Sequence, residues 1–406
     1  MPGGTGVFTA FPESPALSAS ITAFLGSGVG QQGVYGSDVL ANGPPIKVAD
    51  LTTAIPGGTG TFTGFSDLSL TTLPVALVGP PIKVAFLASG AGQQGVYVSA
   101  VDQVLATGPP IKVADLSTTI PGGTGTFTAF SDLSLSTSPV ALTGPPIKVA
   151  FLGSGVGQQG VYGSDVLIVG PPIKVADLTT AIPGGTGTFT GFTAVSTSLG
   201  HTAFLGLGNF GQAGIYRAST LTKVIAVGDT LGGKVITELR FGRSGLDGGT
   251  LAFGATFADG SEGVFVVDVN QPFAAFDAKV EIDLGPRAND DEFAVKATFT
   301  LGAGSNGVDI PTEIVSLQLT GGTGAFSTTI PAGSFKQDKN KKGRFKFEGT
   351  INGVKVEASI RPLGGSAFEF KAEGKRAELT GLANPVTVKL TIGDDGGSAI
   401  VTAKFE

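Results

Sequence analysis

The sequence predicts an all-β protein: a β-propeller-like repeat domain of about five four-stranded blades (residues 1–272), followed by an antiparallel β-sandwich (residues 273–406). Three observations predict it. Short strand-like segments are separated by Gly and Pro turns, a long unit recurs along the chain, and the charge density changes near Pro272. Between four and six blades fit the repeat, and a stacked β-solenoid or a string of small sandwiches is the alternative architecture.

The repeat is marked by two recurring features. The phrase P-G-G-T-G begins at Pro2, Pro56, Pro121 and Pro183, so one unit is about 54 to 65 residues long. All four tyrosines of the chain occupy one repeat position. A unit of this length exceeds leucine-rich and hexapeptide repeats and is near the length of a propeller blade.

One repeat contains four strand-like segments. They are residues 61–70, 82–89, 94–101 and 110–118, which are rich in β-branched and aromatic residues and bounded by Gly and Pro. A fifth, divergent unit (234–269) keeps three such segments. The start of the chain, "MPGGTGVFTAF", aligns with 55–65 and therefore begins within a repeat. We expect this segment to supply the missing strand and close a ring, which protects sheet edges.

The C-terminal part differs in charge and in pattern. Residues 1–272 carry 10 Lys and Arg with 15 Asp and Glu, whereas the shorter segment 273–406 carries 16 and 17. Segments such as "FDAKVEIDL" and "VTVKLTI" alternate apolar and charged residues, which is typical of strands with one buried and one solvated face. About eight to ten strands are predicted here, as an antiparallel sandwich or barrel.

A glycine motif, G-x-G-x-x-G, starts at Gly28, Gly90 and Gly155. A dinucleotide site would need a helix after these glycines, with its N-terminus at the pyrophosphate. The residues that follow, "VYGSDVL" in the first copy, instead predict a short strand. We therefore interpret the motif as a structural turn in which Gly supplies positive φ.

A glutamine beside each repeated tyrosine is the candidate ligand site. An aromatic face and an amide could together bind a sugar by stacking and hydrogen bonding. The alternative is that each Gln caps its turn and each Tyr packs between blades. The candidate residues are Gln32, Tyr35, Gln94, Tyr97, Gln159, Tyr162, Gln212 and Tyr216.

No pattern in the sequence predicts catalysis, a metal site or a cofactor. The chain has no Cys and a single His, which leaves no thiol nucleophile and no His cluster for zinc. Asp50, Asp115 and Asp177 each end a K-V-A-D-L segment before Thr or Ser, which predicts an Asx-turn. We expect a non-enzyme, although paired carboxylates could still meet in three dimensions.

The composition also restricts the partners. A net charge of −6 and a pI near 5.0 argue against nucleic acid, since phosphate binding needs a basic face. No apolar run reaches the length of a membrane span, so membrane insertion is not expected. Met1-Pro2-Gly3 lacks the basic start and apolar run of a signal peptide.

The repeat resembles that of a known group of proteins. F-L-G-x-G-x-x-G-Q-Q-G-V-Y followed by V-A-D-x-x-T-x-I-P-G-G-T-G-T-F resembles a repeat of uncharacterised secreted bacterial proteins, over roughly residues 1–270. The unit at 228–266 resembles the usual ending of such arrays. The resemblance implies a propeller-like protein outside the cytoplasm and no assigned activity. Two departures are the missing leader and a β-domain where a surface-sorting segment is expected.

These observations together predict a non-enzymatic, extracellular structural protein that self-assembles into a surface layer, matrix or filament. Low surface charge favours self-association. The alternative is a lectin-like, carbohydrate- or protein-binding propeller, for which an extracellular glycan is the expected partner.

Overall fold

A computed structural model gives the fold and divides the chain into two compact units, the first ending at Val269 and the second beginning at Asn270. The structure describes residues 1–4, 6–18, 21–38, 44–70, 82–101, 106–136, 149–164, 170–198, 201–287, 289–305, 307–338 and 343–406. Within them the regular secondary structure is all β-strand apart from one 3₁₀ turn, η1 (Asn209–Gly211). Each unit is described by itself below.

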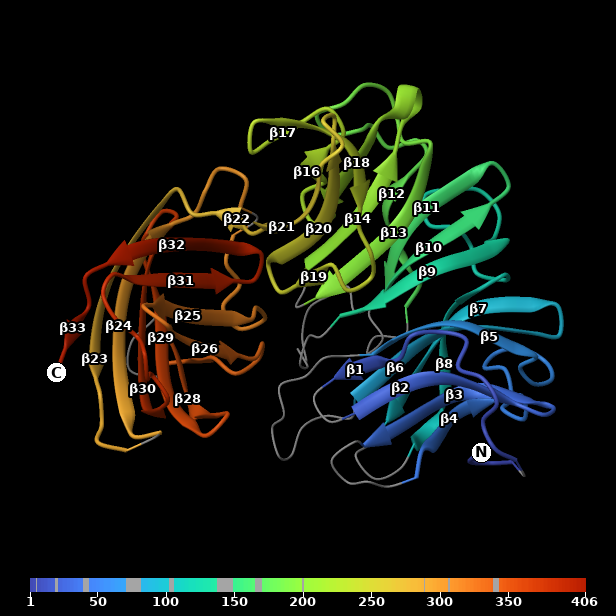
Figure 1. The fold of residues 1–406 in the computed structure, drawn as a ribbon, viewed down its shortest axis with the longest axis horizontal. Coiled ribbons are helices and arrows are strands. Elements are labelled where there is room, and N and C mark those ends of the chain that lie inside the picture. Colours follow the sequence, from blue (N-terminus) through green and yellow to red (C-terminus); the bar gives the residue numbers. More distant parts are fainter. Residues whose placement is uncertain are drawn as a thin grey trace. The chain divides into compact units, whose positions relative to one another are not determined.

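Four antiparallel, four-stranded sheets form blades 1 to 4 of the first unit, in chain order from blue to green (Figure 1). Blade 1 contains β1 (Ala16–Ser18), β2 (Ile21–Gly28), β3 (Gln31–Asp38) and β4 (Ile46–Asp50). Blade 2 contains β5 (Gly64–Leu70), β6 (Ile82–Gly90), β7 (Gln93–Val101) and β8 (Ala106–Asp115). Blade 3 contains β9 (Ala129–Leu135), β10 (Val149–Gly155), β11 (Gln158–Ser164) and β12 (Ile173–Asp177). Blade 4 contains β13 (Gly191–Ser198), β14 (His201–Leu207), β15 (Ala213–Arg217) and β16 (Thr222–Ala226).

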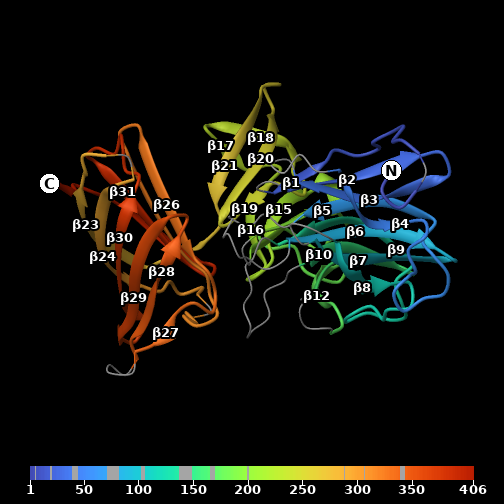
Figure 2. The ribbon, with the colours of Figure 1, turned by 90° about the horizontal axis from the view of Figure 1, so that it is seen from below.

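Blade 5 is the divergent unit, and its long strands are the three that the sequence predicts. It contains β17 (Thr230–Leu231), β18 (Lys234–Arg240), β19 (Leu246–Asp247), β20 (Thr250–Phe257) and β21 (Glu262–Asp268). β18 and β19 both pair with β20, and β21 pairs with the other side of β20. Five successive antiparallel blades confirm the propeller-like fold (Figure 2).

Two predicted strand limits are wrong, each for a local reason. Segment 110–118 was expected to remain a strand, but β8 ends at Asp115 because that side chain caps the following turn. Segment 61–70 was expected to start at Thr61, but β5 starts at Gly64. Thr61 instead bridges to Ala54 within the loop that carries P-G-G-T-G.

The N-terminal segment does not close a ring, contrary to expectation. Ala10 bridges to Ser27, and β1 pairs with β2, so this segment is the first strand of its own blade. The Thr9 N–H donates to the Ser27 carbonyl at 2.8 Å, as the Thr63 N–H donates to the Ser89 carbonyl in blade 2. The segment has the sequence of a first strand and therefore takes that place.

The core of this unit lies between successive blades. One face of a blade carries three Phe rings and one Tyr ring, which we call the aromatic quartet, and this is the blade's front face. The opposite, back face carries Ala, Leu and Val, and in the described chain the back faces of blades 1, 2 and 3 cover the quartets of blades 2, 3 and 4. The covered quartets are Phe62, Phe65, Phe86 and Tyr97; Phe127, Phe130, Phe151 and Tyr162; and Phe189, Phe192, Phe204 and Tyr216.

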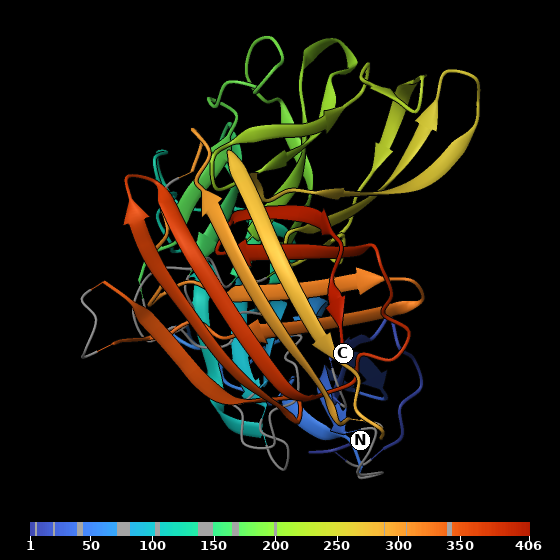
Figure 3. The ribbon, with the colours of Figure 1, turned by 90° about the vertical axis from the view of Figure 1, so that its left-hand side faces the viewer.

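The second unit is a β-sandwich of two sheets, whose strands run in clearly different directions in Figure 3. The five-stranded sheet has the order β22-β32-β31-β25-β26 and the seven-stranded sheet the order β27-β28-β29-β30-β24-β23-β33. The bounds are β22 (Gln271–Pro272), β23 (Ala275–Asp283), β24 (Asp291–Thr300), β25 (Val315–Gly321), β26 (Gly324–Ile330), β27 (Lys336–Gln337), β28 (Phe345–Ile351), β29 (Val354–Gly364), β30 (Ala367–Ala377), β31 (Val386–Ile392), β32 (Asp395–Val401) and β33 (Lys404–Phe405).

Strict alternation along these strands produces the core of the sandwich. In β31, Val386, Val388, Leu390 and Ile392 are fully buried, whereas Thr387 and Lys389 between them are partly exposed. Residues from both sheets form one apolar cluster. The period-2 pattern therefore predicts this part of the fold directly.

Candidate functional site

One repeat position, in or beside the first strand of each blade, carries the candidate site. This position lies two places after a repeated Phe, at Phe11, Phe65, Phe130, Phe192 and Phe241. It is occupied, in blade order, by Glu13, Asp67, Asp132, Ala194 and Arg243. Three acidic residues and one arginine thus meet at one repeat position. We call Glu13, Asp67, Asp132 and Arg243 the axial cluster.

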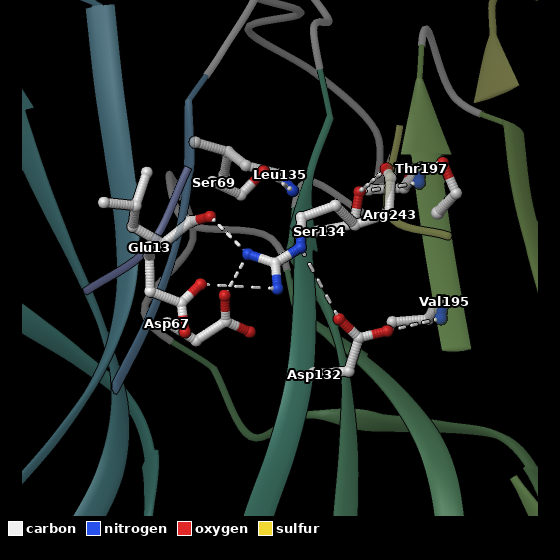
Figure 4. Close-up of polar contacts among 11 residues, drawn as sticks. Glu13, Asp67, Ser69, Asp132, Ser134, Leu135, Val195, Thr197 and Arg243 are labelled. Carbon is white, nitrogen blue, oxygen red and sulfur yellow. Dashed lines mark hydrogen bonds and ion pairs between the residues drawn. The ribbon is translucent and has the colours of Figure 1, made fainter. Parts of the chain in front are cut away.

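Arg243, from blade 5, lies between the three carboxylates (Figure 4). Its Nη1 donates a hydrogen bond to Asp67 Oδ1 and another, of 2.9 Å, to the Leu68 carbonyl. Its Nε is 3.9 Å from Asp132 Oδ1, and its Nη2 is 4.0 Å from Glu13 Oε2. One guanidinium therefore links blade 5 to blades 1, 2 and 3.

Two residues of the axial cluster, Asp67 and Asp132, lie at β-bulges. The pairing register shifts beside Asp67 in β5, and the register of β9 shifts near Asp132, whose φ is +41°. A bulge redirects a side chain and interrupts the ladder, which is a common device near functional centres. The Val195 N–H of blade 4 donates to Asp132 Oδ2 at 2.8 Å, which fixes the Asp132 carboxylate.

Serine hydroxyls connect the same strands from blade to blade. Backbone N–H groups of each following blade donate to them: Leu135 to Ser69 (3.0 Å), Thr197 to Ser134 (2.9 Å) and Leu246 to Ser196 (3.1 Å). The hydroxyls of Ser134 and Ser196 in turn donate to the Arg243 carbonyl, at 3.2 and 2.7 Å. The backbone of Arg243 is therefore held as firmly as its side chain.

The electrostatics of the cluster are set by burial and by like charges. Burial raises the pKa of Asp67 to about 6; Arg243 lowers it, and the neighbouring Asp132 and Glu13 raise it. Burial also raises the pKa of Asp132, against the hydrogen bond from Val195 and the charge of Arg243. Asp67 is therefore both paired with Arg243 and readily protonated, because one guanidinium does not offset burial and two more carboxylates.

This arrangement is suited to holding blades together. Carboxylate pairs can also serve hydrolysis, but here a guanidinium lies between the carboxylates, in the space that a substrate would need. Among the described residues, no group of three or more His, Cys, Asp or Glu side chains is placed to hold a metal ion. The geometry fits a set of ion pairs that links the blades at the centre of the propeller.

The predicted tyrosines lie in the core. Tyr35, Tyr97, Tyr162 and Tyr216 are 0%, 1%, 1% and 2% exposed, and each packs edge-on against a Phe ring of its own blade at 4.9–5.0 Å between centroids. A sugar needs an exposed ring face for stacking. The predicted sugar-stacking role does not fit this placement, whereas the alternative, packing between blades, describes Tyr97, Tyr162 and Tyr216.

The predicted glutamines fasten one blade to another or to a loop. The side-chain amide of Gln94 donates to the Phe130 carbonyl (3.3 Å) and accepts from the Phe130 N–H (2.9 Å) in the next blade. Gln32 and Gln159 make the same pair of bonds to Phe65 and Phe192. Gln212 binds Thr186 in the P-G-G-T-G loop. These side-chain amides therefore form hydrogen bonds with backbone or loop groups of the protein, and not with a ligand.

Two other predicted motifs have the expected geometry. Gly30, Gly92 and Gly157 adopt φ of +68°, +75° and +67° in two-residue hairpin turns, so the glycine motif is a turn. The N–H of Ser117 donates to Asp115 Oδ1 at 3.0 Å, and the hydroxyls of Ser117 and Thr118 donate to the same oxygen. Asp50 and Asp177 form the same Asx-turn.

A second unusual feature is the front face of blade 1. Its quartet is Phe8, Phe11, Phe24 and Tyr35, at the positions of the covered quartets. Phe11 is 61% exposed, whereas its counterparts Phe65 and Phe130 are each 5% exposed. Phe8 and Phe24 are also partly exposed. No preceding blade covers this face within the described chain.

Comparisons with known proteins provide no family. No family model matches the chain, and no curated protein matches it. Among solved structures, Sqt1 of Saccharomyces cerevisiae is 8% identical, with a TM-score of 0.30, over 89% of this chain and 96% of that one. The WD40 domain of Toxoplasma gondii coronin is 8% identical, with a TM-score of 0.23, over 78% and 82%. An engineered GH43 glycoside hydrolase is 10% identical, with a TM-score of 0.27, over 96% and 90%. At these scores the likenesses carry no argument about activity.

The axial cluster is the feature that sequence reasoning missed. Aligning the repeats on Phe11, Phe65, Phe130, Phe192 and Phe241 shows an acid two places later in three units and Arg243 in the fifth. Opposite charges at one repeat position are a signal in the sequence itself.

The described residues contain no helix long and apolar enough to cross a membrane.

Proposed function

We propose that this protein is a non-enzymatic structural protein that self-associates into an extracellular layer, matrix or filament. The proposal agrees with the resemblance to secreted repeat proteins and with the low fraction of charged residues, 14%. The propeller supplies a body whose blades are fastened to one another by side-chain amides, hydroxyls and the axial cluster.

The observation that carries the proposal is the open aromatic quartet of blade 1. Three copies of the same face are buried within the chain, where each Phe contributes roughly 1.5–3 kcal/mol by leaving water. Monomeric proteins rarely leave a contiguous apolar face exposed unless something binds it. Within the described residues three of the four aromatic quartets are covered and one is open, and such an open apolar face is suited to association.

The test is assembly of the purified chain across a concentration series, followed by sedimentation velocity and negative-stain electron microscopy. We expect species larger than the monomer to grow with concentration and to form fibres or sheets with a regular repeat. Raised salt should not dissolve them, because the open face is apolar. A monodisperse monomer at every concentration and salt would refute the proposal.

A further inference from the structure

The back face of blade 5 is the counterpart of the open front face of blade 1. Val264 follows Gly263 and precedes Phe265, at the place that Val34 occupies between Gly33 and Tyr35. Cross-strand pairing supports this alignment, because Phe253 pairs with Phe265 as Phe24 pairs with Tyr35. The equivalent residues in blades 1 to 4, namely Val34, Val96, Val161 and Ile215, are fully buried.

Val264 is nevertheless 82% exposed, and Val266 two residues later is 66% exposed. In blades 1 to 3 the equivalent valine lies in the apolar cluster that covers the next aromatic quartet. No apolar cluster of the described residues joins blade 5 to blade 1. The array therefore ends in two uncovered faces: an aromatic front face on blade 1, and on blade 5 a back face with two exposed valines beside the charged side chains of Arg240, Glu238 and Glu262.

We propose that the back face of blade 5 on one copy of this chain covers the aromatic quartet of blade 1 on a second copy. This inference rests on the proposed self-association and names its junction. The internal interfaces of the chain are the template, because they show which face fits over a quartet. The two faces differ, so the contact is heterologous, and a heterologous contact that does not close produces a filament.

The charges on the blade 5 face suit such a junction. Arg240 pairs across the sheet with Gly254, which itself pairs with Val264. The Arg240 guanidinium is held by Glu238 at 3.3 Å and by Glu262 at 3.0 Å. In the other blades the position of Arg240 is occupied by a small residue, Ala10, Gly64, Ala129 or Gly191. A guanidinium facing Phe rings adds a cation–π contact, yet keeps the separated face soluble.

Closure of the ring within one copy would use the same two faces. In the structure, however, Phe11 and Val264 are both exposed, so neither face covers the other, even though Arg243 of blade 5 lies 4.0 Å from Glu13 of blade 1. An experiment must therefore separate contact between copies from contact within a copy. The absence of native cysteine makes this direct, because every disulfide comes from introduced residues.

The experiment uses full-length single-cysteine variants, Phe11→Cys and Val264→Cys, mixed and oxidised at concentrations where the wild-type chain assembles. We expect the mixed disulfide dimer to form at least tenfold faster than in a control mixture of Val29→Cys and Val156→Cys. These control residues are 96% and 87% exposed at hairpin tips, and their chains should assemble normally. The variant carrying both Phe11→Cys and Val264→Cys should give a ladder of covalent multimers.

Two results would overturn the inference. In the first, the double variant forms a disulfide within one chain at every dilution, which would mean that the ring closes on itself. In the second, the wild-type chain assembles but the Phe11–Val264 mixture reacts no faster than the control, which would place the junction elsewhere and leave the proposed function standing. If the wild-type chain does not assemble at all, the proposed function fails first, and this inference fails with it.

Discussion

Blades 1 and 2 carry the same four aromatic side chains in the same arrangement, but they differ in exposure. In blade 2 the back face of blade 1 covers the rings, and Phe65 is 5% exposed; in blade 1 the equivalent Phe11 is 61% exposed. The difference lies in the neighbour and not in the blade. In a repeat array each unit is stabilised by its own packing and by its contacts with adjacent units, so the terminal units lack part of this stabilisation.

The largest expected effect on stability comes from removing one Phe ring from the covered quartet of blade 2 and comparing it with the same change in blade 1. Phe86→Ala in blade 2 should lower the free energy of unfolding of the propeller by about 3–5 kcal/mol, because it leaves a cavity in a closed core. The equivalent change in blade 1, Phe24→Ala, should cost less than half of that, since its ring is already partly exposed. Urea unfolding followed by tyrosine fluorescence would measure both, because every tyrosine lies in the first unit. Equal costs in the monomeric protein would contradict this account of the difference.

A smaller difference in unfolding free energy is expected between loss of a buried Asx-turn and loss of an exposed one. Asp115→Ala should lower the free energy of unfolding by about 1–3 kcal/mol, because the buried Asp115 carboxylate accepts hydrogen bonds from Lys112, Ser117 and Thr118 that would all be lost. Asp259 accepts two hydrogen bonds from Ser261, at 3.0 and 2.6 Å, but its side chain is 51% exposed. Asp259→Ala should therefore change the midpoint of unfolding very little, because water replaces the lost carboxylate. A large loss in Asp259→Ala would show that the turn itself, rather than burial, carries the stability.

A dependence of stability on pH, with opposite sign, is expected at two carboxylates. The pKa of Asp67 is raised to about 6, so its stabilising contribution is present at low pH and is lost as pH rises from about 4 to about 6. The pKa of Asp177 is lowered to about 2 by hydrogen bonds from Lys174, Thr179 and Thr180 that outweigh its burial. Its contribution is therefore present above pH 4 and is lost as pH falls towards 2.

Comparison with the Asp67→Asn variant isolates the first of these effects. The free energy of unfolding of the wild-type chain minus that of Asp67→Asn should fall between pH 4 and 6 and then level off. Asp132→Asn should shift this fall to lower pH, because it removes a like charge beside Asp67. A difference that rises over that range would mean that the Arg243 ion pair outweighs burial.

Local patterns predicted much of this fold. Alternation in segments such as "VTVKLTI" predicts the sandwich strands, and the repeat length with its Gly and Pro turns predicts the blades. The Asx-turn at Asp115 follows from its own neighbours in sequence. These features depend on residues within a few positions of one another, which a sequence displays directly.

What could not be predicted depends on residues far apart. The Arg243–Asp67 pair joins positions in blades 5 and 2: aligning the repeats shows opposite charges at one repeat position, but only the structure shows that these two side chains meet. The sequence leaves both roles of Tyr97 open, sugar stacking and packing between blades, because a tyrosine beside a polar turn is compatible with either an exposed or a buried ring. Its burial is decided by the back face of the preceding blade.

The axial cluster gives the propeller a dependence on its number of blades. Each interior junction matches an aromatic front with an aliphatic back, so the gain or loss of a whole blade by recombination of near-identical repeats would leave workable junctions. Arg243, however, needs carboxylates from blades 1, 2 and 3 at fixed positions around it. An array one blade longer or shorter would keep its cores and lose its central ion pairs. Those ion pairs therefore favour the present number of blades among otherwise interchangeable repeats.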